Sequence, residues 1–258
     1  MTWTTRPRSD LNGLAAITAG DGPLVLLLHG VGLRAEAWNA QIDALAPRYR
    51  VVAPDLPGHG QSPAPTAERL GAFTDAVAQL LEEPGLVVGH SMGALIALDL
   101  AGRYPDRVDG LAALNSVFRR SDSARAAVKA RADRLDGQSV GDPGPTLHRW
   151  FGDSPSPERA ACESWLRAND PEGYRIAYGV FARSDGPSSA SLKALAVPAL
   201  FMTGEAEPNS TPAMSRAMAD LAPQGQAVIV PGAAHMLPMT HAETVNAALL
   251  DLAADCLP

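Results

Sequence analysis

Leu86-Val87-Val88-Gly89-His90-Ser91-Met92-Gly93-Ala94-Leu95 is the stretch that decides the fold, because it joins an apolar run to an apolar helical pattern through Gly-His-Ser-Met-Gly. The spacing Gly-x-Ser-x-Gly predicts a buried strand, a sharp turn with the serine at its apex, and then a helix. The two glycines leave room for the strand and the helix to pass closely. The hydroxyl of Ser91 would lie at a helix N-terminus, where free N–H groups favour developing negative charge. We therefore predict that Ser91 is a nucleophile, and a plain glycine-rich turn is the alternative.

Composition and charge narrow the class of protein. The chain has 258 residues, of which 46% are hydrophobic and 19% charged, and this suits one α/β domain with room for an insertion. A net charge of −7 argues against nucleic acid or an anionic membrane as the partner. The sequence has no apolar run of about 18 residues, so no membrane span is expected. The first ten residues carry no apolar signal core, which predicts a cytoplasmic protein.

Apolar runs mark the expected sheet. The run 24–28 is continuous, as in a central parallel strand that is covered on both faces. Residues 14–18 alternate weakly and predict an edge strand. Further strands are expected at 50–55, 86–88, 109–114, 199–203 and 226–230, and helices at 35–45, 66–82, 94–101 and 241–252. Cys162 and Cys256 have neither metal-site nor catalytic spacing, and we expect both to be reduced.

The region between the strands at 109–114 and 199–203 differs in character. From 118 to about 185 it has no strand-like apolar run, and short amphipathic helical patterns are broken by 141–145 and 152–157. Most of the aromatic residues of the chain lie here, and for each of them packing is the preferred interpretation. Arg119 and Arg120 could meet a carboxylate of a substrate, but a solvated face is the preferred expectation.

Three motifs together resemble the α/β-hydrolase family. They are His29-Gly30-Val31-Gly32, the loop 55–62 with the sequence Asp-Leu-Pro-Gly-His-Gly-Gln-Ser, and the 89–93 motif, in the order and spacing of that family. The chain looks similar to its branch of small bacterial esterases, enol-lactonases and C–C hydrolases. The resemblance implies an α/β fold with a mostly parallel central sheet, helices on both faces and a helical cap insertion. It divides the chain into core 1–117, cap 118–187 and core 188–258, and it implies structural roles for Asp55 and His59.

The resemblance also assigns the catalytic residues. It implies that the backbone N–H groups of Val31 and Met92 form the oxyanion hole. Relatives often carry Gly-x-x-Asp after the strand 199–203, and here Glu207 occupies the place of the aspartate, with Glu205 as the competitor. His235 follows the last strand, where the family keeps its base. The order Ser91, Glu207, His235 is the family order of nucleophile, acid and histidine.

These residues predict a serine hydrolase that cleaves a small carboxylic ester or lactone through an acyl-enzyme, without a metal or another cofactor. Hydrolysis of a C–C bond in a vinylogous diketone and cofactor-free perhydrolysis are alternatives on the same triad. A non-catalytic binding protein is a third, and only the glutamate at 207 favours it. The expected partner is a small molecule, and the oligomeric state stays open, with a homo-oligomer as one option.

Overall fold

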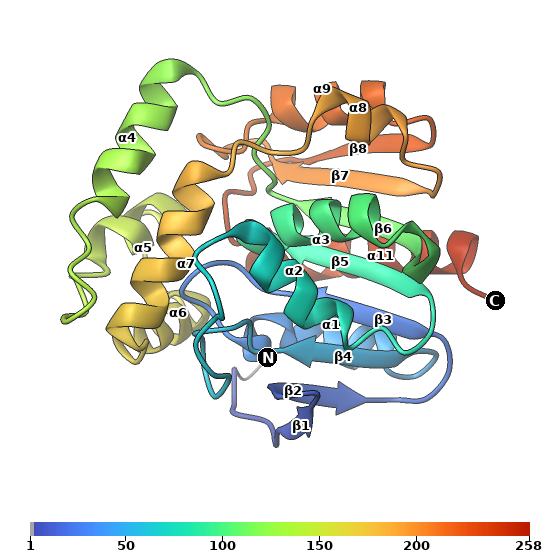
Figure 1. Cartoon of the computed structure of the whole chain (residues 1–258), viewed down its shortest axis with the longest axis horizontal. Coiled ribbons are helices and arrows are strands. Elements are labelled where there is room, and N and C mark those ends of the chain that lie inside the picture. The colour runs from blue at the N-terminus through green and yellow to red at the C-terminus, as the bar shows by residue number, and fades with distance from the viewer. Residues whose placement is uncertain (1–2) are drawn as a thin grey trace.

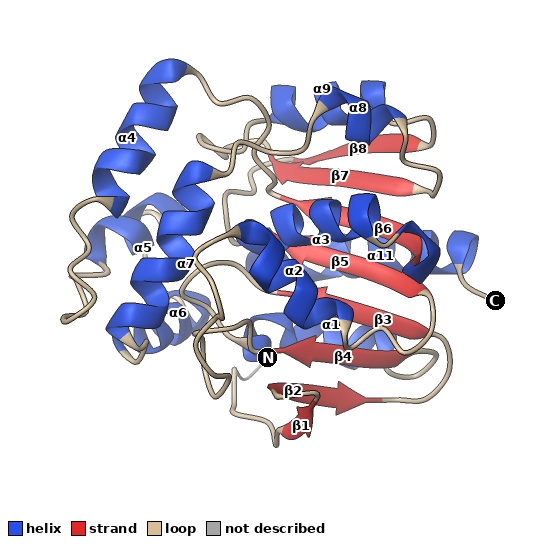
Figure 2. Cartoon of the chain, in the orientation of Figure 1, coloured by secondary structure: helices blue, strands red, loops and turns tan. Residues whose placement is uncertain are grey.

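An eight-stranded sheet organises the protein in the computed structural model, which describes residues 3–258. The strand order is β1-β2-β4-β3-β5-β6-β7-β8. Strands β3 to β8 run parallel, whereas β2 is antiparallel to both β1 and β4 (Figures 1 and 2). The strands are β1 (Ser9–Leu11), β2 (Leu14–Ala19), β3 (Leu24–Leu28), β4 (Arg50–Pro54), β5 (Gly85–His90), β6 (Val108–Leu114), β7 (Ala199–Gly204) and β8 (Gly225–Val230).

The register of the central strands decides which loops meet. In the β3–β5 pair Leu24 lies opposite Gly85 and Leu28 opposite Gly89, so the two strands end side by side. The loop after β3 therefore starts next to the turn after β5. Both strands are fully buried, because helices cover both faces of the sheet. The fold class predicted from the sequence is confirmed.

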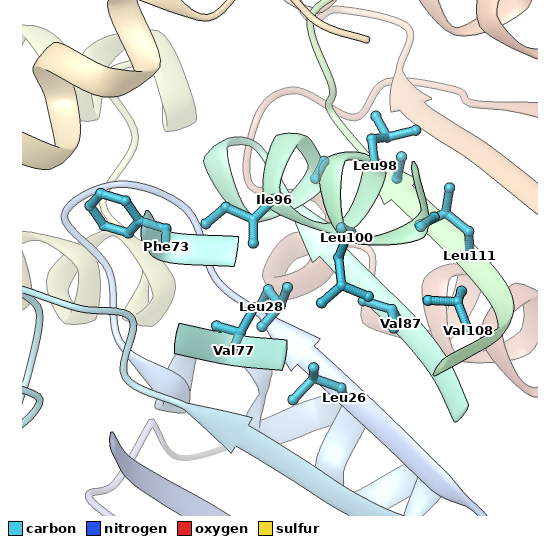
Figure 3. Close-up of a cluster of buried hydrophobic side chains, with 14 of the residues drawn as sticks. Leu26, Leu28, Phe73, Val77, Val87, Ile96, Leu98, Leu100, Val108 and Leu111 are labelled. Carbon is cyan, nitrogen blue, oxygen red and sulfur yellow. The ribbon is translucent and has the colours of Figure 1, made fainter. Parts of the chain in front are cut away.

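Two apolar cores lie on opposite faces of the sheet. On one face α2 (Leu70–Ala78), α3 (Met92–Arg103) and α9 (Pro212–Leu221) pack on the strands. Figure 3 shows part of this core, where side chains of α2 and α3 meet those of β3, β5 and β6. On the other face α1 (Asn39–Leu45) and α11 (Ala242–Cys256) cover the sheet, after the short helices η1 (Ala35–Trp38) and α10 (Leu237–Thr240). A further short helix, η2 (Pro105–Arg107), leads into β6.

A layer of helices lies beyond the carboxyl ends of the parallel strands (Figure 1). It comprises α4 (Asp122–Ala132), α5 (Gly144–Phe151), α6 (Pro157–Arg167) and α7 (Pro171–Arg183), and α8 (Ser189–Lys193) then leads back to β7. Ser121, Ser156 and Asp170 accept backbone N–H groups at the starts of α4, α6 and α7. Proline is the first residue of both α6 and α7, where its missing N–H costs no hydrogen bond. Three of these four helices thus start at a side chain that accepts a free backbone N–H group, and α5 is the exception. The domain boundaries given above stay a prediction.

Two expectations about element limits were wrong. Residues 14–18 do not form the edge of the sheet, because β1 pairs outside β2 through a tight turn at Asn12 and Gly13, both with positive φ. The helix expected at 66–82 is confined to α2, since Arg69 is extended, with φ −144°, and turns replace the helix after Ala78. Among residues 3–258, no helix has the length and hydropathy that crossing a membrane requires.

Candidate active site

Ser91 occupies the tight turn between β5 and α3. Its φ of 58° and ψ of −112° are strained for a residue with a side chain, and such strain concentrates at functional sites. The N–H of Ser91 is held by the carbonyl of Leu114 at 2.8 Å. A Cβ on Gly89 would collide with the carbonyl oxygen of Gly93, and one on Gly93 would collide with that of Leu28. The two glycines of the motif are therefore required by the close passage of strand and helix.

His235 and Glu207 come together from the loops after β8 and β7. The Nδ1 atom of His235 lies 2.8 Å from Oε2 of Glu207, whose side chain is buried. The other oxygen of Glu207 accepts the backbone N–H groups of Asn209 at 2.7 Å and Ser210 at 3.2 Å. The side-chain amide of Asn115, which directly follows β6, also donates to Oε2 at 3.4 Å. The carboxylate is thus fixed from three directions, and Nε2 is the nitrogen of His235 left for other contacts.

The surroundings of Glu207 keep it ionised. Burial alone would raise its pKa, but the charge and hydrogen bond of His235 and the two backbone N–H groups lower the pKa to about 2. Glu205, the competing acid, is exposed and accepts the N–H of Gly232 at 3.1 Å instead. Of the two glutamates, only Glu207 contacts the imidazole of His235 in the described hydrogen bonds.

Ser91 and His235 line one cavity of about 480 Å³ between the sheet and the helical layer. The hydrogen bonds among residues 3–258 include none between the Ser91 hydroxyl and the His235 ring. In related chemistry this bond often tightens only when a substrate is bound. The structure therefore brings Ser91, His235 and Glu207 to one site, and in it the predicted acid and the predicted base are already in hydrogen-bond contact.

The loop after β3 runs next to Ser91. A Cβ built on Gly30 would lie only 3.2 Å from the Ser91 Cβ, so this backbone approaches the nucleophile closely. Val31 lines the cavity, and no hydrogen bond within residues 3–258 uses the N–H of Val31 or of Met92, the first residue of α3. Two backbone donors beside Ser91 thus face no protein acceptor. This is the placement that the oxyanion hypothesis requires.

Buried histidines hold these loops together. Nε2 of His29 accepts the N–H of Leu56 at 2.9 Å, and Nε2 of His59 accepts the N–H of Gly32 at 3.0 Å. Nε2 of His90 lies 2.8 Å from the carbonyl oxygen of His235. Burial lowers the pKa of all three, to about 4 for His59 and to about 3 for His90, where the charge of His235 adds to the effect. They are neutral in the folded protein at neutral pH.

Acidification is therefore expected to destabilise the fold already at pH values well above those at which carboxylates titrate. His59 and His90 keep a lowered pKa in the fold but take up protons near 6.5 in the unfolded chain. Their contribution to the free energy of unfolding is complete above pH 6.5 and is lost as the pH falls from 6.5 towards 4. Between about pH 7.5 and about pH 5 we expect each to lower the free energy of unfolding by about 2 kcal/mol. Urea unfolding at the two pH values measures this, and His59→Asn should show a smaller loss. An equal free energy at both pH values would contradict it.

Four arginines line the cavity on the side of the helical layer. Arg131 and Arg134 reach it from the end of α4, Arg149 from α5, and Arg120 from the segment after β6. Arg120 is 6% exposed and lies 3.5 Å from Asp185, so the solvated face expected for it was wrong. Arg119 does point outward, towards Ser189. Arg131, Arg134 and Arg149 form no ion pair with any acid of residues 3–258.

Two of these guanidinium groups donate hydrogen bonds to the same hydroxyl oxygen. The Thr146 Oγ1 atom, buried in α5, accepts from Arg131 at 2.5 Å and from Arg149 at 3.2 Å. Partial burial and the charge of Arg131 lower the pKa of Arg149. Two cations held side by side without an acid favour an anion between them. Sequence reasoning missed these arginines, because a few arginines on amphipathic helices do not differ in the sequence from a solvent-exposed charged face.

A serine elbow at the end of a parallel strand, a histidine–acid pair from the two following strands and a helical layer over the sheet define an α/β hydrolase. The sequence model of the alpha/beta hydrolase fold matches residues 23–242, and the chain belongs to this family.

Known proteins similar to this chain include several hydrolases. It is 39% identical over 238 residues to the (E)-2-((N-methylformamido)methylene)succinate hydrolase of Acinetobacter baylyi. The aligned region covers 89% of this chain and 90% of that protein. It is 31% identical to a pimeloyl-[acyl-carrier protein] methyl ester esterase of Edwardsiella ictaluri, over 91% of this chain and 94% of that one. Among solved structures, a thermophilic esterase from Thermogutta terrifontis with malate bound superposes with a TM-score of 0.87 at 28% identity, covering 98% of this chain and 100% of that one.

Proposed function

We propose that this protein is a serine hydrolase that works through an acyl-enzyme on Ser91. The observation that carries this proposal is the 2.8 Å contact between His235 Nδ1 and the buried carboxylate of Glu207, in a cavity that Ser91 also lines. A carboxylate at Nδ1 fixes the tautomer in which Nε2 can accept a proton. The strained turn presents the Ser91 hydroxyl at the same cavity.

The proposed reaction has two steps. Ser91 attacks a carbonyl carbon while His235 takes its proton, and the negative oxygen that forms is held by the N–H groups of Val31 and Met92. His235 then gives the proton to the leaving group, and the acyl group stays on Ser91. In the second step His235 takes a proton from water, the hydroxide attacks the acyl-enzyme, and the acid is released as Ser91 regains its proton.

The substrate we propose is a small molecule with two carboxylates that also carries an ester, a lactone or an N-acyl group. Three arginines of the cavity have no acid partner among residues 3–258, although the chain as a whole has a net charge of −7. A substituted succinate in the name of the Acinetobacter relative, and malate in the Thermogutta structure, are both dicarboxylates. The Acinetobacter relative is named for an N-acyl compound and the Edwardsiella relative for a methyl ester, and these names support an N-acyl or ester bond as the one that is cleaved.

A labelling experiment tests the chemistry before the substrate is known. A fluorophosphonate should modify the protein once, and mass spectrometry of the peptides should place the adduct on Ser91. Turnover of a panel of esters, lactones, N-acyl compounds and vinylogous diketones then identifies the bond. Absence of labelling would contradict the serine mechanism, and turnover of diketones alone would contradict the proposed bond.

Arg149→Met is expected to remove the preference for anionic substrates. The mono-4-nitrophenyl ester of succinic acid and 4-nitrophenyl butanoate have acyl chains of equal length, and only the first carries a carboxylate. We expect kcat/KM for the anionic ester to fall by about tenfold to hundredfold, mostly through KM, because a hydrogen bond to a charged group is lost. The value for butanoate should change little.

Arg119→Met is the matched control, because Arg119 lies outside the cavity. It removes the same charge from the protein and should leave both esters unaffected. Equal losses on the two esters in Arg149→Met, or equal losses in the two variants, would contradict a carboxylate site at Arg149.

A further inference from the structure

One aromatic residue of the helical layer lies directly against the candidate base. The ring of Trp150 in α5 is stacked on the imidazole of His235, with centroids 5.4 Å apart and planes at 21°. The ring of His90 also packs against His235, at 4.9 Å and 52°. The imidazole is therefore in contact with two rings, one from the sheet and one from the helical layer.

The same helix is fastened to the loop that carries His235. Leu147, Trp150 and Phe151 follow one another at helical spacing in α5. They pack in a cluster with Met236 and Met239, the first of which directly follows His235. The stack of Trp150 on His235 thus belongs to a larger apolar contact between α5 and this loop. Displacement of α5 would break both together.

We propose that Trp150 is a positioning residue for His235, and this inference rests on the proposed serine mechanism. The hydrogen bond of Glu207 holds the ring at one atom only, and the ring can still tilt about that contact. A stacked indole restricts the tilt and keeps Nε2 directed at the cavity. The face of an indole within about 6 Å also attracts a cation, so it stabilises the imidazolium that forms when His235 takes the proton of Ser91. Such an interaction exists only after proton transfer begins, and it acts on kcat.

Trp150 also lines the cavity, so the competing role is that of a residue that only shapes the binding site for the substrate. A small neutral fluorophosphonate separates the two roles, because it reacts with Ser91 but carries no carboxylate for the arginines to bind. A residue that only shapes the binding site would change KM for the anionic ester and leave the reaction with the probe unaffected. A positioning residue would slow the reaction of Ser91 with any reagent.

We expect Trp150→Leu to slow labelling of Ser91 by a neutral fluorophosphonate about tenfold, which corresponds to about 1.4 kcal/mol. It should lower kcat for 4-nitrophenyl butanoate by a similar factor with KM nearly unchanged. Trp150→Phe keeps an aromatic face and should restore most of both rates. If Trp150→Leu does not fold, Trp150→Met, which fills more of the space, carries the same expectation.

Trp165→Leu is the matched control, because Trp165 belongs to the same apolar cluster but does not contact His235 in the described structure. Trp165 is buried and Trp150 only partly so, and the control should therefore lower the melting temperature at least as much as Trp150→Leu, without the loss in labelling rate. Equal losses in the two variants, or a change in KM alone, would overturn the proposal. Failure of the wild-type protein to be labelled would instead overturn the serine mechanism itself.

Discussion

Ser91→Ala is expected to lower kcat by about 10⁵-fold to 10⁶-fold, because no other group of the site replaces the nucleophile. The hydroxyl of Ser91 takes part in no hydrogen bond among residues 3–258, and alanine bears the positive φ of the turn no worse than serine. We therefore expect the melting temperature to change little. Steady-state kinetics on the preferred ester, together with thermal unfolding, measure both quantities.

A second buried serine provides the control for this substitution. Ser116 follows the neighbouring strand β6 and is fully buried, but it does not line the cavity. Ser116→Ala should keep kcat within a few-fold of the wild-type value. If Ser91→Ala retains more than about one tenth of the wild-type activity, the nucleophile is another group and the proposed mechanism is wrong.

Glu207→Gln is expected to lower kcat by about 10³-fold to 10⁴-fold with little change in KM. The amide has no charge to stabilise the imidazolium of His235, and its NH₂ group can hold the ring in the unproductive tautomer. The volume is unchanged, so the fold should remain. The variant should also lose the part of the stability that Glu207 supplies. That part is present above the ordinary pKa of 4.5 and is lost as the pH falls towards 2.

The neighbouring glutamate tests whether the effect is specific. Glu205→Gln changes the same chemical group two residues earlier in the same loop, at an exposed position that contacts Gly232. We expect its kcat to equal that of the wild-type protein. A larger loss in Glu205→Gln than in Glu207→Gln would show that the acid had been assigned to the wrong glutamate.

The sheet and the site residues that follow its strands were predictable, because the features that fix them are visible in short stretches of the sequence. Continuous apolar runs imply strands that are buried on both faces, and the glycines around Ser91 imply a close passage that the structure shows at Gly89 and Gly93. The loops after the last two strands then carry Glu207 and His235. Both can be placed because parallel strands deliver such loops to one edge of the sheet.

The part of the site that the helical layer contributes could not be predicted in the same way. Arg131, Arg149 and Trp150 lie on short amphipathic helices, and a charged helix face points to solvent unless another element covers it. Which face is covered depends on how α4 to α7 pack over the sheet, and no residue spacing within one helix encodes that. The edge strand β1 was missed for a simpler reason, since three residues are too few to show a period.

Asn115 follows β6 and Glu207 lies in the loop after β7, and the two side chains meet. The amide of Asn115 and the ring of His235 share the same carboxylate oxygen, Oε2 of Glu207. The residue after β6 and the loop after β7 therefore meet at one carboxylate, because β6 and β7 are neighbours in the sheet. A change of the Asn115 side chain is therefore felt by His235 only through Glu207, since the described hydrogen bonds join Asn115 to the carboxylate and not to the imidazole.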